Sequence, residues 1–261
     1  MEAWLTAVIQ RWKWIMSILN KTYWFTNRKK YEIDIFQLLQ PQWMVKKQSR
    51  YKSGLFYSQK CQRDIQYESG LELEFIKKME QLDEVRFYWE QPTQIQYRLK
   101  SGKKLTYTPD FAIYLKSKEI ILVEIKDLLT MLENPVQKRI EGLMHFCSKK
   151  GFGLLLTDGK DTIEVIKKYK TNKKLEKAIL NGIQENRVLR RSEYRSILKE
   201  QEGTQKELMK IILKDNLKFG SHAGKLEMNN KNKIFRHVFI ENKPYEEIYS
   251  SLFLTNELKL K

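Results

Sequence analysis

Three carboxylates and one lysine in the first half of the chain are the residue types that phosphodiester cleavage requires. The carboxylates are Glu72, Asp110 and Glu124, and the lysine is Lys126. Cleaving a phosphodiester bond needs neutralisation of the charge on the scissile phosphate and a deprotonated water. A hard cation such as Mg²⁺ takes oxygen ligands, and proteins hold it with one or two carboxylates together with phosphate oxygens and waters. These residues therefore point to metal-dependent phosphodiester chemistry.

The sequence between Asp110 and Glu124 predicts a β-hairpin. Residues 112–115 and 120–123 are apolar and rich in strand-forming types, and residues 116–119 form a polar turn between them. Asp110 begins the first strand and Glu124 lies at the end of the second. Because the strands of a hairpin run antiparallel, we expect both carboxylates at one rim of a small sheet.

Alternation along the second strand decides which side chains join that rim. Side chains at positions i and i+2 of a strand share a face. Glu124 and Lys126 should therefore point the same way, while Val123 and Ile125 point to the other side. Asp110 and Glu124 would hold the metal, and the backbone carbonyl of Ile125 would add an oxygen. Lys126 would orient the attacking water or offset the developing negative charge.

A helix is expected to bring Glu72 to the same rim. Leu71, Phe75 and Met79 recur at the spacing of one helical face. Each charged motif alone has an ordinary structural explanation, because Asp after Pro suits a turn, Glu-x-Lys is a common solvated pair, and a helical Glu is mostly exposed. The combination of helical Glu, Pro-Asp, hairpin and Glu-x-Lys, in that order, favours the catalytic interpretation.

The order of these motifs resembles the PD-(D/E)XK nuclease superfamily and, within it, the TnsA family, the endonuclease subunits of heteromeric cut-and-paste transposases. Residues 54–60 and 63–69 look like the hairpin that precedes the catalytic helix in that family. The segments that follow the family's pattern are the helix at 69–73, the start of a strand at 90–92, and the motifs at 107–111 and 123–126. The similarity is specific over roughly residues 50 to 170 and weaker from there to about residue 250.

This resemblance implies roles and partners. It places Glu72, Asp110, Glu124 and Lys126 at the metal and catalytic positions, although some family members carry Gln at the position of Glu124. The metal is expected to be Mg²⁺, for which Mn²⁺ can substitute. The implied activity cuts the 5′ strand ends of a mobile element. The implied partners are double-stranded DNA at the transposon ends, a TnsB-like DDE transposase that cuts the 3′ ends, and a TnsC-like AAA+ ATPase that regulates both.

Strand, helix and strand follow one another after the Glu-x-Lys motif. Asn134 and Pro135 open a helix that runs to Cys147, Gly151 suits its C-terminal stop, and residues 152–157 read as a buried strand. A right-handed crossover would place this strand parallel to an earlier one. We therefore predict an α/β fold class, with a nuclease domain built as a restriction-endonuclease-like α/β/α sandwich.

The composition changes after about residue 167, where a smaller helical domain is expected. Helical patterns precede two predicted strands around a polar loop; the helices are 175–183, 192–201 and 204–213, and the strands are 217–220 and 234–240. Thr204 and Glu207 have the spacing of a capping box. This order suggests a winged helix, which binds DNA in the major groove or docks a protein. The sequence leaves both uses open.

We accordingly predict four segments. They are an N-terminal helical and aromatic extension (1–50), the nuclease domain (51–168), a C-terminal helical, winged-helix domain (169–252) and a basic tail (253–261). The extension carries a helical stripe from Trp4 to Leu19, which would pack on the nuclease domain or dock a partner or a membrane interface. Residues 23–31 mix aromatic and basic side chains, which suits base stacking or an aromatic core with a basic rim.

The charge balance favours a nucleic-acid partner. The chain has 49 Lys and Arg against 32 Asp and Glu, a formal net charge of +17 and a pI near 9.6. Such an excess attracts a polyanion through counterion release and steering, although a generally Lys-rich protein would share it. The candidate DNA contacts are Lys103, Lys104, Lys138 and Arg139, with solvated surfaces as the alternative.

Other classes of site are disfavoured. The two cysteines, Cys61 and Cys147, form no CxxC motif, which argues against a zinc site. No stretch approaches the ~20 apolar residues of a membrane span. We expect no membrane partner and a cytoplasmic location in a bacterial cell, on the nucleoid when DNA is bound.

Two other functions stay open. A stand-alone restriction or repair nuclease of the same fold should cut its target DNA without partners. A catalytically silent DNA-binding assembly subunit would keep the fold alone, and the intact Glu72, Asp110, Glu124 and Lys126 argue against it.

Overall fold

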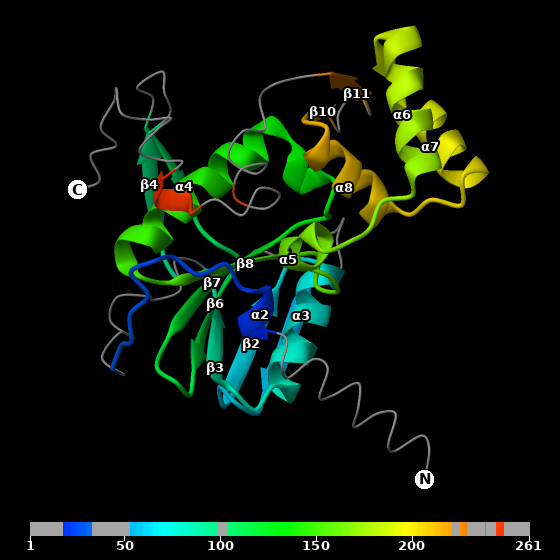
Figure 1. Cartoon of the computed structure of the whole chain (residues 1–261). Helices are drawn as coiled ribbons and strands as arrows, with labels where there is room; N and C mark the ends of the chain where they lie inside the picture. Colours follow the sequence, from blue (N-terminus) through cyan, green and yellow to red (C-terminus); the bar gives the residue numbers. More distant parts are fainter. Residues whose placement is uncertain are drawn as a thin grey trace. The chain divides into compact units, whose positions relative to one another are not determined.

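The computed structural model describes residues 18–32, 53–98, 104–220, 225–228, 238 and 244–247 (Figure 1). The chain divides into two compact units. The described residues up to Ile125 form the first unit together with Leu143–Lys160, and those of Lys126–Gly142 and from Asp161 onward form the second. The predicted stripe from Trp4 to Ile15 and the predicted tail 253–261 lie outside the described residues. The predicted domain boundaries stay predictions.

A four-stranded mixed sheet in the order β3-β6-β7-β8 is the centre of the first unit. Its strands are β3 (Val85–Glu90), β6 (Phe111–Leu115), β7 (Ile120–Ile125) and β8 (Gly153–Thr157). β6 pairs antiparallel with β7 from Phe111↔Val123 to Tyr114↔Ile120, so the predicted hairpin is confirmed. β8 runs parallel to β7, as the strand–helix–strand order predicted. This mixed α/β architecture is consistent with a restriction-endonuclease-like domain.

Helix α3 (Gly70–Gln81) covers one face of this sheet. It buries Phe75, Ile76 and Met79 in a cluster that also contains Val123 and Ile125 of β7. Every residue of β6 and β7 is buried, because each of the two strands has neighbours on both sides and both faces are covered. The predicted alternation holds, since Val123 and Ile125 lie on the side of α3 and Glu124 lies between them on the strand.

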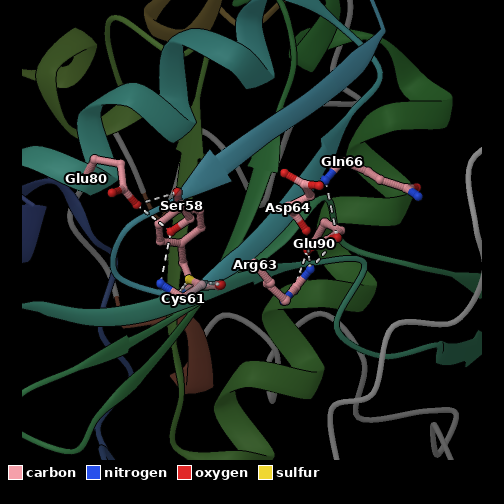
Figure 2. A network of polar contacts seen from close by, with 8 residues as sticks. Ser58, Cys61, Arg63, Asp64, Gln66, Glu80 and Glu90 are labelled. Atoms are coloured by element: carbon pink, nitrogen blue, oxygen red, sulfur yellow. Dashed lines mark hydrogen bonds and ion pairs between the residues drawn. The ribbon is translucent and has the colours of Figure 1, made fainter.

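Two antiparallel hairpins flank the sheet. The first joins β1 (Gly54–Ser58) to β2 (Arg63–Tyr67), as predicted, and the second joins β4 (Ile95–Arg98) to β5 (Lys104–Tyr107). Figure 2 shows how polar contacts tie the first hairpin to its surroundings at two points. Ser58 Oγ donates to Glu80 of α3 at 2.5 Å, and the Arg63 guanidinium makes a two-pronged ion pair with Glu90 of β3 at 2.9 and 2.7 Å. The hairpin is thus fixed to both the helix and the sheet.

One sequence expectation about this region was wrong. Residues 90–92 were expected to start a strand, whereas Glu90 is the last residue of β3 and pairs with Phe111. The strand lies before this motif because Val85, Tyr88 and Trp89 are the buried residues that hold it in the sheet. Residues 91–94 then lead the chain away to β4.

The crossover from β7 to β8 follows the predicted course. A short 3-10 helix, η2 (Thr130–Leu132), precedes α4 (Asn134–Lys150), and Gly151 ends the helix at a φ of 74°. A side chain at Gly151 would also collide with the backbone oxygen of Asn27, so both the backbone conformation and the lack of space require glycine there. No helix among the described residues is both long and apolar enough to cross a membrane.

The segment 22–32 packs on the edge of the sheet beside α2 (Ile18–Lys21). Tyr23 exchanges two backbone hydrogen bonds with Leu154 of β8, at 2.8 and 2.9 Å. Phe25 is buried, and the Arg28 guanidinium lies 3.8 Å from the ring centroid of Trp24 while pairing with Glu119 at 2.7 Å. These contacts are those of an aromatic core with a basic rim, one of the two uses expected for this segment.

The second unit contains helices and a small antiparallel sheet in the order β10-β11-β9. Its helices are α5 (Ile163–Lys167), α6 (Lys173–Asn186), α7 (Arg191–Glu200) and α8 (Gln205–Lys214), and its strands are β9 (Val188–Leu189), β10 (Leu217–Gly220) and β11 (Lys225–Met228). The three predicted helices and the first predicted strand are confirmed.

The partner of β10 differs from the prediction. It is β11, in a stretch predicted to be a polar loop, while residues 234–240 lie outside the described part of the chain except for the buried Val238. Leu226 explains the difference, because it is fully buried and pairs with Phe219 on one side and Leu189 on the other. β11 holds only two apolar residues, Leu226 and Met228, and so short an alternation is too little to predict a strand.

Candidate active site

Asp110 is held at the end of β7. Its backbone N–H donates to the carbonyl of Val123 at 3.1 Å, and its carboxylate accepts from the backbone N–H of Ile125 at 2.6 Å. Pro109 before it is buried, which fixes the approach of the chain to β6. The hairpin therefore brings Asp110 to the Glu-x-Lys motif, as the sequence predicted, and does so through the backbone of Ile125.

Glu124 is fully buried near the end of β7. The hydroxyl of Tyr107, the last residue of β5, donates a short hydrogen bond to its carboxylate. A buried carboxylate is costly unless hydrogen bonds or a cation compensate it. The strand thus presents an acidic group in a place where a cation would stabilise the charged form.

Glu72 belongs to the first turn of α3 and is bound to the residues that cap this helix. Its carboxylate accepts from the Ser69 hydroxyl at 2.9 Å and from the Glu68 backbone N–H at 2.7 Å. Its own N–H donates to Ser69 Oγ at 3.2 Å. Burial, and after it the negative charge of Asp110, raise the pKa of Glu72 to about 7. The structure therefore brings Glu72 and Asp110 within electrostatic reach and also gives Glu72 a structural role.

Lys126 follows directly after β7 and is partly buried. The carbonyl of Ile125 lies between Glu124 and Lys126 along the chain and belongs to the residue whose N–H fixes Asp110. The Glu-x-Lys motif thus occupies the end of the strand that the sequence assigned to it.

The carboxylates do not form a ready-made metal cage. Among the residues that the structure describes, no three Asp, Glu, His or Cys side chains are grouped closely enough to hold a metal ion. A closed, four-ligand zinc site is therefore absent from this part of the chain. One or two carboxylates fit Mg²⁺, which keeps several waters and takes its remaining oxygens from substrate phosphates. The donors at the end of β7 match that incomplete, substrate-dependent kind of site.

Three contacts to the predicted residues were not foreseen. Ser69 caps the helix of Glu72, Tyr107 binds Glu124, and Gln91 bonds to Asp110. The spacing of Ser69 and Glu72 is that of a capping box and was a usable signal. The other two contacts join distant parts of the sequence, and nothing in the sequence indicated them.

The candidate DNA contacts are spread over both units. Lys104 is the exposed first residue of β5, and Lys138 is exposed on α4. Arg139 is partly buried and its Nε donates to the carbonyl of Pro135 at 3.4 Å. Lys103 lies outside the described residues. A role in DNA binding stays a prediction for all four.

The region that carries the candidate site is similar to a known family of domains. Residues 58–155 match the family model of an endonuclease domain, and this range contains Glu72, Asp110, Glu124 and Lys126. The match runs from the last residue of β1 into β8, so it contains β2, α3, the strands from β3 to β7 and the start of β8. No curated protein matches the chain. The matched domain and the mixed α/β fold support a restriction-endonuclease-like nuclease.

Proposed function

We propose that this chain is a Mg²⁺-dependent DNA endonuclease of the TnsA type. In this role it cuts the 5′ strand ends of a mobile element, beside a DDE transposase that cuts the 3′ ends and an AAA+ ATPase that regulates both. The observation that supports it most is the 2.6 Å bond from Ile125 N–H to the Asp110 carboxylate, because it joins the Pro-Asp motif to the Glu-x-Lys motif inside a matched endonuclease domain.

The chemistry follows from the residues at the end of β7. Bound Mg²⁺ supplies Lewis-acid stabilisation of the phosphate charge and lowers the pKa of a coordinated water. Asp110, Glu124 and the Ile125 carbonyl offer the oxygens that would hold it. The Lys126 ammonium donates a hydrogen bond to the attacking water or to the developing negative charge. Glu72, whose pKa is about 7, adds a further carboxylate charge when it is ionised.

The second unit is proposed to be a winged-helix domain. From α6 onward its order is helix, short strand, two helices and two strands, and the short β9 pairs with β11 to complete the three-stranded sheet. Helices followed by a small antiparallel sheet support this proposal. The position after the nuclease domain agrees with the resemblance to the TnsA family.

Mapping the cuts tests the proposal. Purified protein is incubated with element-end DNA and Mg²⁺, alone and with the transposase and ATPase, and nicks are located on both strands. We expect cuts at the 5′ strand ends that depend on the partners, and none with the Asp110→Asn variant. Cuts confined to the 3′ ends would contradict the TnsA assignment.

A stand-alone nuclease is the second candidate. It is favoured because the matched family model describes an endonuclease domain and names no role in transposition. It predicts efficient, sequence-selective cutting by the purified chain in Mg²⁺ without partners. The same incubation without transposase and ATPase separates the two. The silent assembly subunit predicts no cuts under any of these conditions.

A further inference from the structure

Gln91 holds a strained backbone conformation beside the candidate active site. Its φ is 44°, in the left-handed region that non-glycine residues avoid. Pro92 follows, and a proline further restricts the residue before it. Non-glycine residues in such conformations cost on the order of 1–3 kcal/mol and persist only where their surroundings impose them. The contacts of Gln91 show what imposes this one.

Gln91 bonds to both carboxylate-bearing elements. Its backbone N–H donates to the carbonyl of Asp110 at 2.9 Å, and its side-chain amide donates to the carboxylate of Glu68 at 3.1 Å. The backbone N–H of Glu68 in turn donates to Glu72. One residue therefore links the loop that carries Asp110 to the cap of the helix that carries Glu72.

The residue before Gln91 is anchored firmly. Glu90 is buried and accepts both prongs of the Arg63 guanidinium together with the backbone N–H of Gln66 at 3.3 Å (Figure 2). Two-pronged Arg–carboxylate pairs fix geometry as well as adding energy. With Glu90 fixed on one side and the buried Pro92 on the other, Gln91 has little freedom to relax.

We propose that Gln91 is a positioning residue that sets the separation between Glu72 and Asp110. The inference rests on the proposed nuclease function, because that separation matters where the two carboxylates serve one metal site. Mutation of a residue that hydrogen-bonds to a metal ligand typically lowers metal affinity or activity by about 10- to 100-fold. The strained backbone of Gln91 is then explained by the need to hold these two carboxylates at a fixed separation.

Replacement by glycine tests this inference, since glycine accepts positive φ and removes the side-chain link. For Gln91→Gly we expect thermal stability that is unchanged or higher, a Kd for Mn²⁺ raised about 10-fold in calorimetry, and kcat lowered about 10-fold or more at unchanged KM for DNA. Gln91→Asn, which tolerates the conformation and keeps an amide, should recover part of the loss.

Gln62 provides a matched control. It is also a glutamine at positive φ, 53°, but it lies in the turn between β1 and β2, where its side chain bonds to the carbonyl of Gln59. Gln62→Gly should relieve similar strain and leave metal affinity and cleavage unchanged. If Gln91→Gly behaves like Gln62→Gly, the positioning role is rejected while the nuclease proposal survives. If the wild type neither binds Mn²⁺ nor cuts DNA, both are rejected.

A cavity in the second unit carries an independent inference. It has a volume of about 220 Å³ and is lined by Arg191 and Arg195 of α7, Gln205 of α8, and Asp127. Tyr194 and Phe219 belong to its apolar part, with Leu129 and Leu198, and the two rings meet edge to face with centroids 6.4 Å apart. The two arginines are four residues apart, so they lie on one face of α7, and both are exposed.

The charges of this cavity favour an anion. Two arginines and one aspartate line the cavity, and Asp127 already accepts backbone hydrogen bonds from Leu129 and Thr130 at 3.1 and 3.3 Å. Guanidinium groups match phosphate oxygens in a planar, two-pronged geometry. A phosphate group can thus sit on the arginines while a sugar packs on the aromatic floor.

We infer that this cavity binds a phosphate group of the DNA backbone. The inference builds on the proposed function but is measured without cleavage, in EDTA, so its failure is separate from failure of the nuclease proposal. Arg191→Gln with Arg195→Gln should weaken DNA binding and reduce the slope of log Kd against log salt by about 0.9 per lost phosphate contact.

The control is the double variant Lys174→Gln with Lys177→Gln. Both residues are exposed on α6, and the two substitutions remove the same amount of positive charge from the same unit. Equal effects of the two double variants would reject a specific cavity contact. Inorganic phosphate is titrated in parallel by calorimetry. If the arginine double variant no longer binds inorganic phosphate but keeps its affinity for DNA, the cavity is a site for free phosphate and the DNA assignment is overturned.

Discussion

Helices α3 and α8 start with the same local motif, but the glutamate in the first turn of each helix makes different contacts. Glu207 folds back on its own cap, accepting from the backbone N–H of Thr204 at 2.9 Å while its N–H donates to Thr204 Oγ1 at 3.2 Å. Glu72 also donates its N–H to its cap, Ser69, but its carboxylate reaches one residue further back, to Glu68. The Glu of α3 is thereby turned toward the loop that Gln91 ties to Asp110.

This difference teaches that a capping motif does not reveal whether its glutamate has a second role. The hydroxyl-x-x-Glu spacing specifies the helix start in both units. At Glu72 another carboxylate approaches, because Asp110 contributes to the raised pKa there. The environment assembled by distant parts of the chain therefore distinguishes a candidate ligand from a purely structural glutamate.

The largest effect that would sharpen this contrast is loss of the partner carboxylate. Asp110→Asn should lower DNA cleavage by a factor of at least about 100, because it removes the negative charge of a carboxylate that is proposed to hold the metal ion. Glu207→Gln, at the structural cap, should leave cleavage unchanged. Nicking of supercoiled DNA in Mg²⁺ measures both. Wild-type activity in Asp110→Asn would remove the chemical distinction between the two helix starts.

Lys126 supplies the next effect. Lys126→Ala should lower the rate of cleavage by about 10²-fold, since a positioned ammonium acts on the transition state. Its affinity for Mn²⁺ should not fall, because an ammonium is not a ligand for a cation. Calorimetry and single-turnover cleavage on the same preparation separate these effects. Loss of metal binding in this variant would contradict the role assigned to Lys126.

Local sequence patterns predicted the elements that position the site. The hairpin of β6 and β7 follows from two apolar runs around a polar turn, and α4 follows from Pro135 at its start and Gly151 at its end. In these segments the neighbours along the chain decide the structure, so periodicity and turn chemistry suffice.

The contacts that complete the site were beyond sequence reasoning. Tyr107 reaches Glu124 from 17 residues away, and Gln91 reaches Glu68 from 23 residues away. Such pairs depend on how the hairpins dock on the sheet, which no local pattern encodes. The positive φ of Gln91 is equally hidden, because a residue before proline is expected to be extended.

The raised pKa of Glu72 predicts a pH dependence of metal binding and of stability. A cation prefers the ionised carboxylate, so metal binding near pH 7 should release a proton from Glu72, and the Kd should rise as pH falls below about 7. In the metal-free protein the folded state binds more protons than the unfolded state between pH 4.5 and about 7, so stability should fall as pH rises through that window.

Calorimetry in two buffers of different ionisation enthalpy counts the released protons. Glu72→Gln should abolish the release and flatten the stability profile, whereas Glu207→Gln should change neither. A proton release that persists in Glu72→Gln would assign the titration to another group.

The smallest effects come from the caps themselves. Ser69→Ala and Thr204→Ala should each cost about 1 kcal/mol of stability, because each leaves a helix N–H without its hydroxyl partner. Only Ser69→Ala should also weaken metal binding at pH 7, since the Ser69 hydroxyl donates to the Glu72 carboxylate and holds the pKa of Glu72 below the value that burial alone would give. Thermal unfolding and Mn²⁺ calorimetry on the two variants make the comparison direct. Equal metal affinity in both would mean that the cap of α3, like that of α8, serves the helix alone.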